Sequence, residues 1–450
     1  MKKLLLMILA VAGYVGTASA TDYYIGANTG DNGNSWEIQG QMIDEDNDGT
    51  YSLIISIPKK EWVSDNLQYF DQLYFTICTS SEFNWNNVFR PKNVAENTDF
   101  VITNNESGNE VEMSEESSTK TGTINYPNSW QDSQYKNYAS AIKIDYTPTT
   151  HILKVTRLIS VISGYNGWSK SIDYLTETSN GSKIYTGAVT LENESTGDDG
   201  FKFYIHNDGW ENYCGKGNDG KINNSAGNVT VDKDGVYILT AQLTDWAWTD
   251  PTFVTVTASA GTYGMATLSS EYALDFTGIT GVAAYTITRA DKATGELTKT
   301  PVTGKVKAGT GLYIEGNQGA SAVIPTTICT EEATGNMLVA ATTEKTIPQV
   351  DDTYTNYILT VNKAGGNNVD TPKFFKVNTA GNTVLAGKAY LQIPTTEAAR
   401  MSFWFNDSVS AIEGVEQASM DGPVYNVAGQ RVAQPVKGLY IANGKKFIKK

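Results

Sequence analysis

Short runs in which apolar and polar residues alternate with a period of two occur throughout this chain. The segments "VYILTAQL" (236–243) and "FVTVTAS" (253–259) alternate cleanly, and Gly, Asn, Asp and Thr interrupt such runs every few residues. A period of two places successive side chains on opposite faces of a β-strand. No window sustains a helical stripe over three turns, although "KKEWVSDNLQYF" (59–70) has room for one short helix. The pattern predicts an all-β protein.

A diverged internal repeat divides the first half of the chain. The segments "LYFTICTSSEFNW" (73–85) and "GFKFYIHNDGW" (200–210) each combine an alternating strand, a polar turn and a Trp. A glycine-rich loop that ends in Trp precedes each of them, "GANTGDNGNSW" to Trp36 and "SGYNGW" to Trp168. Repeats of this size are typical of tandem immunoglobulin-like β-sandwiches. We therefore predict two such modules, at 21–158 and 159–258, with a mobile acidic loop at 104–122 in the first.

The second half of the chain has a different composition. Eight of the nine tryptophans lie before residue 251, and residues 259–410 are rich in Ala, Thr, Gly and Val. Runs such as "GLYIEG", "NYILTV" and "KAYLQIP" predict a further β domain of unknown role there. A tail at 411–450 follows, and its last 27 residues contain six basic residues and no acid. Asn443-Gly444 within it predicts a two-residue hairpin.

The N-terminus predicts export. Lys2 and Lys3 precede an apolar run, and Ala18-Ser19-Ala20 fits a signal-peptidase site, so residues 1–20 are interpreted as a signal peptide. No later segment is apolar for long enough to predict a transmembrane helix. Loss of Lys2 and Lys3 takes the formal charge from −15 to −17. Because a polyanion repels phosphate, nucleic acid and anionic membranes are poor candidates for partners.

Residues for catalysis or for a metal site are scarce. The three cysteines, Cys78, Cys214 and Cys329, are scattered, which predicts small buried residues at Cys78 and Cys329 rather than a disulfide framework. The only two histidines, His151 and His206, lie in different modules and are interpreted as surface strand residues. The sequence leaves open a pair of carboxylates that meets only in space, as in glycosidases. We expect a protein that is not an enzyme.

Two short motifs imitate ligand sites without their context. "DEDNDG" (44–49) begins like an EF-hand loop, with Asp44, Asp46 and Asp48 in place, but its twelfth position is Ile55 instead of Glu. We interpret it as a hairpin turn rather than a Ca²⁺ site and expect no cofactor. "GKGNDG" (215–220) matches a dinucleotide fingerprint by letters only, because no helix is predicted after it.

Aromatic residues among Asn, Asp and Gly are the remaining candidates for a site. A sugar ring packs its C–H face on Trp or Tyr, while polar neighbours bind its hydroxyls. In 200–210, alternation assigns Phe201, Phe203 and Ile205 to the core and places Lys202 on the outward face with Tyr204 and His206. A Trp in a glycine loop can equally close the edge of a sandwich, and the sequence leaves both interpretations open. The candidate carbohydrate-binding residues are Trp36, Trp85, Trp168, Lys202, Trp210, Tyr213 and Trp246.

These motifs resemble the modules of SusE/SusF-type proteins, the surface starch-binding proteins of starch-utilisation systems. The resemblance covers 21–258 and is better in the second module, with "SGYNGWS", "GFKF" and "GVYILTAQLTD". It implies β-sandwiches that bind α-glucan through Trp168, Lys202 and Trp210. In the first module Trp36 and Trp85 match, but Thr76 replaces the Lys, which implies weaker binding. The lipobox usual in that family is missing.

The tail "KGLYIANGKKFIKK" resembles the C-terminal sorting domain of type IX secretion cargo. Together the resemblances imply an exported protein, at the surface of the outer membrane or extracellular, with polysaccharide and outer-membrane glycan-uptake proteins as partners. We therefore expect a non-catalytic carbohydrate-binding protein. The alternatives are a structural or adhesive surface protein that binds no sugar, and a glycoside hydrolase or its accessory subunit.

Overall fold

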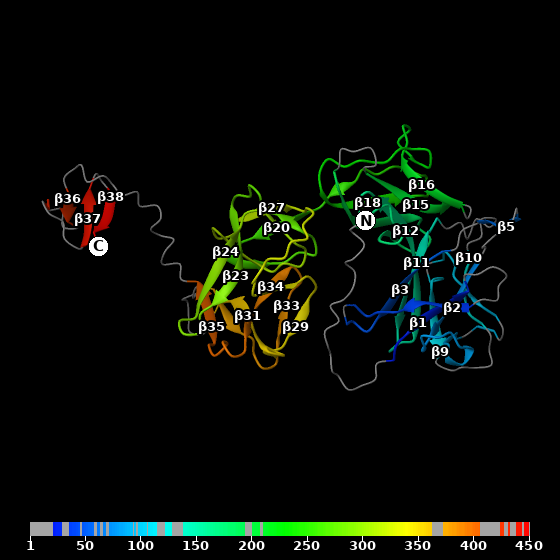
Figure 1. Cartoon of the computed structure of the whole chain (residues 1–450), viewed down its shortest axis with the longest axis horizontal. Helices are drawn as coiled ribbons and strands as arrows, with labels where there is room; N and C mark the ends of the chain where they lie inside the picture. The colour runs from blue at the N-terminus through cyan, green and yellow to red at the C-terminus, as the bar shows by residue number, and fades with distance from the viewer. Residues whose placement is uncertain are drawn as a thin grey trace. The chain divides into compact units, whose positions relative to one another are not determined.

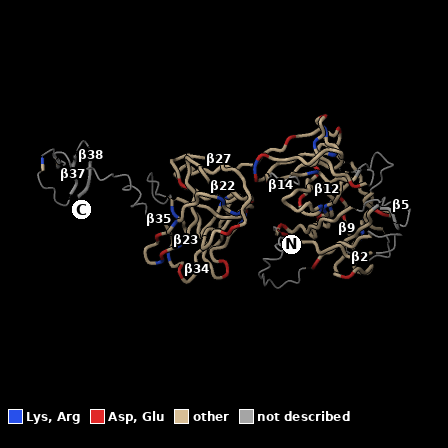
Figure 2. The backbone as a smooth tube through the Cα atoms, turned by 45° about the horizontal axis from the view of Figure 1, so that its top comes forward, with Lys and Arg blue, Asp and Glu red and all other residues tan. Residues whose placement is uncertain are grey.

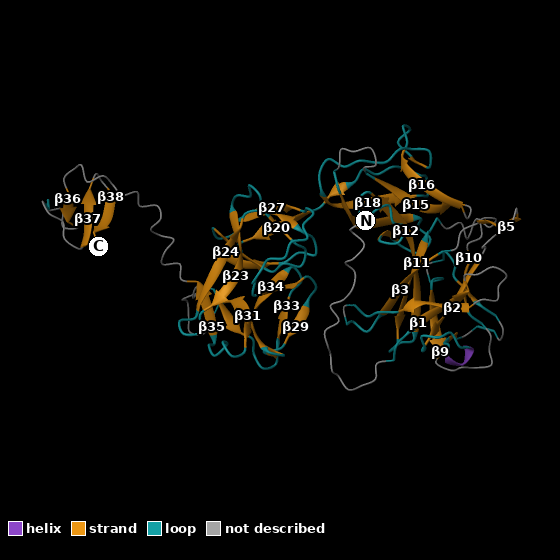
Figure 3. Cartoon of the chain, viewed as in Figure 1, coloured by secondary structure: helices purple, strands orange, loops and turns teal. Residues whose placement is uncertain are grey.

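The computed structural model confirms the all-β fold (Figure 3). It describes residues 21–28, 36–45, 47–57, 61–63, 66–68, 72–92, 94–95, 98–105, 107–114, 122–127, 138–193, 200–207, 210–361, 372–405, 424–426, 431–432, 438–442 and 445–449. The helical element within these residues is a three-residue 3-10 turn, η2 (Trp85–Asn87). The chain forms two compact units, Met1–Val254 and Thr255–Lys450 (Figure 1).

The segment 59–70, which had room for one short helix, is extended where the structure describes it. This segment contains two strands, β4 (Glu61–Val63) and β5 (Asn66–Gln68), which pair antiparallel. Trp and Val favour extended backbone, and Ser64-Asp65 between the strands is typical turn chemistry. Local β propensity therefore outweighed a helical pattern that was too short to nucleate a helix.

The first sandwich of unit 1 has two facing sheets. One has the strand order β2-β1-β6-β10-β8, and the other is formed by β3, β7, β9, β11 and the first half of β12. Side chains from both sheets build a single core, for example Phe75 and Ile124 from one and Ile144 and Val155 from the other. The strands are β1 (Tyr24–Asn28), β2 (Trp36–Gln41), β3 (Tyr51–Ser56), β6 (Gln72–Cys78), β7 (Arg90–Pro91), β8 (Phe100–Val101), β9 (Glu110–Ser114), β10 (Ile124–Pro127), β11 (Ala141–Thr147) and β12 (Ile152–Ser163).

Strand β9 lies inside the acidic stretch that the sequence predicted to be a mobile loop at 104–122. The short alternation of apolar and acidic residues in this strand is sufficient for burial on one face, because Val111 and Met113 point into the core and are only 5% and 1% exposed. The strand pairs with β12 on one side and with β7 on the other. Glu110 and Glu112, which alternate with these two apolar residues, occupy the outer face.

The second sandwich is one long sheet that bends around its own core. Its strand order is β17-β16-β15-β12-β13-β14-β18-β19, and both halves contribute to the same hydrophobic cluster. Phe201, Phe203 and Ile205 are inside that cluster, as their alternation predicted. The strands that follow β12 are β13 (Asp173–Glu177), β14 (Ile184–Leu191), β15 (Phe201–Asn207), β16 (Trp210–Lys216), β17 (Ile222–Asn223), β18 (Gly235–Gln242) and β19 (Thr252–Phe253).

Strand β12 belongs to both sandwiches. On one edge it pairs first with β11 and then with β15, and on the other first with β9 and then with β13. The two sandwiches are therefore continuous through hydrogen-bonded backbone rather than joined by a loop. The boundary at residue 158 that the sequence predicts falls within this strand, at Leu158, which lies opposite both Ala141 and Thr176.

A buried ion pair lies where the two sandwiches meet. Arg157 of β12 is 1% exposed, and its Nη1 is 3.4 Å from Oε2 of Glu177 at the end of β13. The same guanidinium lies 5.6 Å from the ring centroid of Tyr126, which belongs to the first sandwich, and donates to Asn180 of the second. Asn180 Nδ2 in turn donates to the carbonyl oxygen of Thr103 at 2.9 Å. One cation thus connects groups from both cores.

Unit 2 contains a large sheet with the order β21-β26-β23-β24-β35-β32-β31-β34-β28. The sheet curls, because Ser269 N donates to Gly387 O at 2.9 Å and Ala389 N to Thr267 Oγ1 at 3.1 Å, which joins β21 to the start of β34. The strands of this sheet, in chain order, are β21 (Met265–Leu268), β23 (Val282–Ala290), β24 (Glu296–Val302), β26 (Leu312–Gly316), β28 (Leu338–Ala341), β31 (Tyr354–Thr360), β32 (Lys373–Lys376), β34 (Lys388–Pro394) and β35 (Ser402–Phe405).

Short strand pairs complete unit 2. β20 (Thr255–Ser259) pairs with β27 (Ser321–Pro325), so the segment that the sequence assigned to the end of the second sandwich pairs within unit 2. The remaining strands are β22 (Leu274–Asp275), β25 (Lys305–Val306), β29 (Lys345–Ile347), β30 (Val350–Asp351) and β33 (Asn382–Val384). The runs "GLYIEG", "NYILTV" and "KAYLQIP", from which the sequence predicted strands, form β26, β31 and β34.

The tail contains a three-stranded sheet of β36 (Val424–Asn426), β37 (Gly438–Ala442) and β38 (Lys445–Lys449). Ala442 lies opposite Lys445, as a two-residue hairpin requires, while Asn443 and Gly444 themselves lie outside the described residues. Within the described part of the chain, no helix has the length and apolar character needed to cross a membrane.

We predict that Arg157→Ala destabilises both sandwiches together. The change leaves the Glu177 carboxylate buried without its cation, which typically costs about 3–5 kcal/mol of unfolding free energy. Tryptophan fluorescence during thermal unfolding of the full chain reports mainly on unit 1, because eight of the nine tryptophans lie before residue 251.

Lys154→Ala is the matched control for this experiment. Lys154 is on the same strand, but its ion pair with Glu110 is about half exposed on both sides, so its loss should cost no more than about 1 kcal/mol. An Arg157→Ala variant that melts like the Lys154→Ala variant would show that the buried pair does not hold the junction.

Candidate functional site

The β15–β16 hairpin of the second sandwich carries three of the candidate site residues. Antiparallel pairing sets Asn207 opposite Trp210, Phe203 opposite Cys214 and Tyr204 opposite Tyr213. Directly opposite residues share a face of the sheet. Trp210 therefore lies on the face of Phe203 and Ile205, whereas Tyr213 lies on the face of Tyr204 and Lys202.

The structure does not bring Trp210 and Lys202 together, because they project from opposite faces of the hairpin. Trp210 is the first residue of β16, is not part of the apolar core cluster and is 41% exposed. Its carbonyl oxygen accepts from Nδ2 of Asn212 at 2.8 Å, and Nδ2 of Asn224 donates to Oδ1 of Asn212 at 3.2 Å. Two amide side chains thus lie next to the backbone of Trp210 at the edge of the sandwich.

Tyr204 and His206, which the sequence placed on an outward face, are buried at 5% and 2% exposure. The reason is that chain segments cover this face of β15. Lys170, in the loop after β12, lies over this face with its Nζ 4.6 Å from the Tyr204 ring centroid, and Glu211 accepts from the Tyr204 hydroxyl; along the edge of the strand, His206 N donates to the carbonyl oxygen of Tyr138 at 3.1 Å. The other histidine, His151, is half-buried, and its Nδ1 is 3.3 Å from Tyr146 Oη.

Tyr213 is part of a cluster with two charged residues that sequence analysis missed. Its ring is 37% exposed and lies 5.3 Å from the ring of buried Tyr204. Lys170 Nζ is 5.2 Å from the Tyr213 ring centroid and 2.6 Å from Oε1 of Glu211, which also accepts from the Tyr204 hydroxyl. Burial, and then the hydrogen bond to Glu211, raise the pKa of Tyr204, so this phenol stays a donor at neutral pH.

Trp168 is held in a tight loop between β12 and β13. Its backbone has φ +61°, which is uncommon for a residue with a Cβ, and its N–H donates to Ser163 O at 2.8 Å. Asn166 stabilises the loop, since its Oδ1 accepts from the N–H of Ser163 and of Ser169, and its Nδ2 donates to Asp173 at 2.8 Å. The Trp168 side chain is half-buried, two residues before Lys170.

Trp246 and Trp248 pack at the edge of the second core. Trp246 makes an edge contact with Tyr138 at 5.1 Å between ring centroids. Trp248 lies against Phe201 and Phe203 at 6.1 and 5.8 Å, and its Nε1 donates to Asp250 at 2.8 Å. Both rings therefore bury part of their apolar surface against the core. The interpretation that a Trp closes the edge of the sandwich fits Trp246 and Trp248 better than it fits Trp210.

In the first sandwich the structure brings Trp36 and Trp85 together. Their ring centroids are 4.8 Å apart, and Phe83 lies against both, at 5.1 Å from Trp36 and 4.8 Å from Trp85. Trp85 is 43% exposed. The residues 84–87 that carry it are fixed by Asn84, whose Oδ1 accepts from Asn86 N at 2.9 Å.

Thr76, aligned with Lys202, cannot take part in a surface site. It is fully buried, and its hydroxyl donates to Phe89 O. The cation nearest to Trp85 is Arg90, which is only 5% exposed and lies beneath the ring, with its guanidinium 4.7 Å from the Trp85 ring centroid and its Nη1 3.2 Å from Gly122 O. Sequence analysis missed Arg90 because it followed the repeat, in which the cation precedes the Trp.

The EF-hand-like segment forms a turn in the described residues. The two carboxylate oxygens of Asp44 accept from the N–H of Asp48 at 3.1 Å and of Gly49 at 3.0 Å, and Ile43 bridges to Ser52. Asp46 lies outside the described residues. No group of three or more Cys, His, Asp or Glu with a geometry for metal binding occurs in the part of the chain that the structure describes.

The cysteines are unbridged. Cys78 and Cys214 are buried, which confirms the expectation for Cys78, and burial raises the pKa of both thiols to about 11. A thiol with such a pKa is a poor nucleophile at neutral pH. Cys329 is half-buried.

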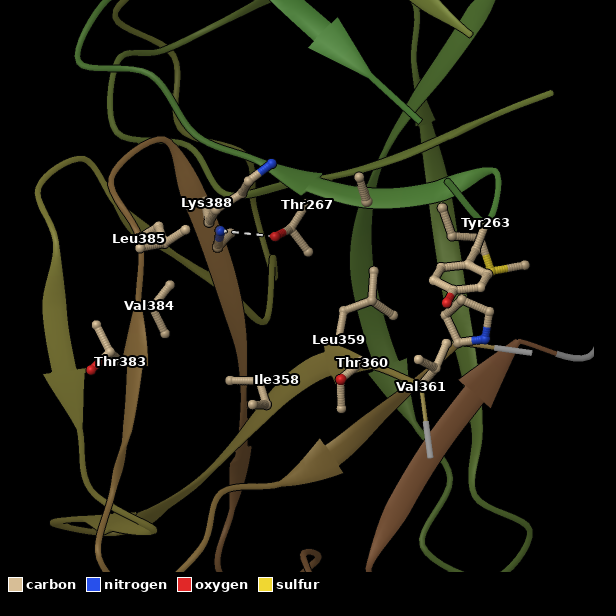
Figure 4. Close-up of a pocket in the computed structure, with 14 residues that line it drawn as sticks. Tyr263, Thr267, Ile358, Leu359, Thr360, Val361, Thr383, Val384, Leu385 and Lys388 are labelled. Atoms are coloured by element: carbon tan, nitrogen blue, oxygen red, sulfur yellow. Dashed lines mark hydrogen bonds between the residues drawn. The ribbon is translucent and has the colours of Figure 1, made fainter. Parts of the chain in front are cut away.

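Unit 2 contains an open apolar groove of about 390 Å³ (Figure 4). Ile358 and Leu359 of β31, Val384 and Leu385, and Tyr263 line it. The Thr267 hydroxyl at its wall already accepts from Ala389 N. The groove is mainly aliphatic, so it differs in kind from the aromatic surfaces of unit 1.

Charged residues of both signs are interspersed over each unit (Figure 2). Several form pairs across strands, such as Lys170–Glu211 and Lys216–Asp250 at 2.6 and 2.7 Å. The positive charges of Lys170, next to Tyr204 and Tyr213, and of Lys216, next to Trp248, are thus balanced by carboxylates.

No family model matches the sequence, and no curated protein matches it. Among solved structures, SusF from Bacteroides thetaiotaomicron is similar at 14% sequence identity and a TM-score of 0.20, over 68% of this chain and 73% of that chain. It is a protein of the type that the sequence motifs resemble.

We predict that Trp248→Ala and Trp210→Ala differ in their effect on stability. Trp248 packs on Phe201 and Phe203, so its removal should cost a substantial part of the roughly 3–5 kcal/mol typical of a truncated core aromatic. Trp210 lies beyond the core, and its removal should cost less than about 1 kcal/mol. Denaturant unfolding of the two full-length variants measures both; equal destabilisation would show that Trp210 is also an edge plug.

Proposed function

We propose that this chain is a non-catalytic carbohydrate-binding protein, secreted or at the cell surface, that binds an α-glucan-like polysaccharide by aromatic stacking. One observation carries the proposal. Of the candidate rings, Trp85, Trp210 and Tyr213 are 43%, 41% and 37% exposed. Large rings that remain this exposed on a folded sandwich contribute little to its core and are available to a ligand.

The surroundings of these rings suit a sugar. A pyranose presents an apolar C–H face for stacking and hydroxyls for hydrogen bonds. Trp85 is flanked by Asn84, Asn86 and the Arg90 guanidinium, and Trp210 by Asn212. The Arg90 guanidinium is buried beneath Trp85, so the amide side chains of the exposed Asn84 and Asn86 and of Asn212 are the groups proposed to bind the hydroxyls of a stacked sugar.

Rigidity of the rings supports the same function. Trp85 is packed against Trp36 and Phe83, and Tyr213 against Tyr204. A ring that is already ordered loses little conformational entropy when a ligand binds. In this proposal Trp36 supports Trp85 in the first module, and Trp168, Lys202, Trp210 and Tyr213 serve the second, with Trp246 at its core edge.

The chain ends fit a protein that works outside the cytoplasm. We assign residues 1–20 to a signal peptide and 411–450 to a sorting module that takes no part in sugar binding. Outer-membrane proteins of glycan uptake are the partners proposed for it. Deletion of residues 420–450 should leave the protein in the periplasm, and unchanged surface delivery after this deletion would refute the assignment.

We predict that Trp85→Ala and Trp210→Ala each weaken binding of the full chain to soluble starch. Loss of a stacking aromatic typically removes about 1–3 kcal/mol, which is roughly 5- to 150-fold in affinity. Affinity electrophoresis in starch-containing gels measures the affinity of each variant for starch. The matched control is Tyr354→Ala, which removes a ring of similar exposure, 43%, from unit 2.

The retardation of wild-type protein and the Tyr354→Ala variant should be equal. If neither starch nor any other glycan retards the wild-type chain, the proposed function is wrong and a structural or adhesive role is favoured. Release of reducing sugar that survives repurification and is lost on changing one Asp or Glu would instead show an enzyme.

A further inference from the structure

The two faces of the β15–β16 hairpin carry different exposed aromatics. Trp210 shares its face with Phe203 and Ile205, and Tyr213 shares the other with Tyr204. The sheet itself separates the two rings, so one sugar residue cannot stack on both. They must belong to two different surfaces.

The Tyr213 surface, formed by Tyr213, Lys170 and Glu211, is organised before any ligand arrives. The Lys170 backbone is fixed because its carbonyl oxygen accepts from Ser160 Oγ at 2.6 Å. Its ammonium group is fixed by Glu211 at 2.6 Å and lies near the rings of both tyrosines. Buried Tyr204 supports Tyr213 from below, and its hydroxyl also contacts His206 Nε2 at 3.1 Å.

Resting on the proposed function, we infer that the Tyr213 surface is a sugar site of its own, separate from Trp210, and that it selects uncharged sugars. Tyr213 supplies the stacking face, and Lys170 is the cation of this site. Lys170 is 41% and Glu211 23% exposed, so both lie within reach of solvent and of a ligand bound on Tyr213.

Charge balance is the reason for the selectivity. The positive charge of Lys170 is compensated by the carboxylate of Glu211 at hydrogen-bond distance, and the whole chain carries a formal charge of −15. A uronic acid or sulfated sugar on Tyr213 would meet a carboxylate and an acidic protein. A neutral sugar meets one fixed donor and one fixed acceptor, which match its hydroxyls.

The experiment uses the full chain with Trp85→Ala and Trp210→Ala already introduced, so that the Tyr213 surface is observed alone. Isothermal titration calorimetry with maltoheptaose should still detect binding in this background. Tyr213→Ala should abolish it, and Tyr213→Phe, which keeps the ring, should retain it. Lys216→Met is the matched control. Lys216 lies on the same strand as Tyr213, and its ion pair with Asp250 is about as long as the ion pair between Lys170 and Glu211.

Glu211→Gln tests the selectivity with a readout that a purely structural role would not change. The amide still accepts a hydrogen bond from Tyr204 but leaves the charge of Lys170 uncompensated. Binding of polygalacturonate relative to maltoheptaose should therefore rise at least several-fold in this variant. Melting temperatures of all variants confirm that they are folded.

The outcomes separate the two proposals. If the wild-type chain binds no glycan, the proposed function fails. If the wild-type chain binds but the Trp85→Ala/Trp210→Ala background does not, or if Tyr213→Ala has no effect in that background, the separate site is refuted and the proposed function stands. Polygalacturonate binding more tightly than maltoheptaose before Glu211 is changed would overturn the selectivity.

Discussion

The organisation of unit 1 depends on one continuous strand with a buried charge at its middle. Because β12 pairs with strands of both sandwiches, neither can shift without breaking ladder hydrogen bonds of the other. Arg157 adds a second constraint, since removing a guanidinium from water is costly unless its partners are held in place. Glu177, Asn180 and Tyr126 supply these partners from both sides of the junction.

The aromatic surfaces of the two sandwiches have the same arrangement of rings and cation. In each sandwich an exposed ring rests on a less exposed ring, and a cation lies against the aromatic group: Trp85 on Trp36 with Arg90, and Tyr213 on Tyr204 with Lys170. The cations come from different places in the two modules. Arg90 follows its Trp along the chain, whereas Lys170 comes from the loop after β12, 41 residues from its partner Glu211.

Period-two alternation predicted the all-β fold and the inward residues Phe201, Phe203 and Ile205, because burial on one face is a local property of a strand. It was wrong for Tyr204 and His206, since alternation says which residues share a face but not what covers that face. It also could not show that Trp210 and Lys202 diverge, which depends on the register of the hairpin. The pairings of Lys170 with Glu211 and of Arg157 with Glu177 exist only through tertiary contact.

A shared strand also has a mechanical consequence. Under the proposed function, a chain that holds a polymer in moving fluid would be under tension, and the tension would cross the junction between the sandwiches. A ladder that is loaded across its strands opens one hydrogen bond at a time. In β12, tension along the strand loads the ladders with β11 and β15 in shear, so many hydrogen bonds must yield together. The junction between the sandwiches should therefore be among the last parts of unit 1 to fail under drag.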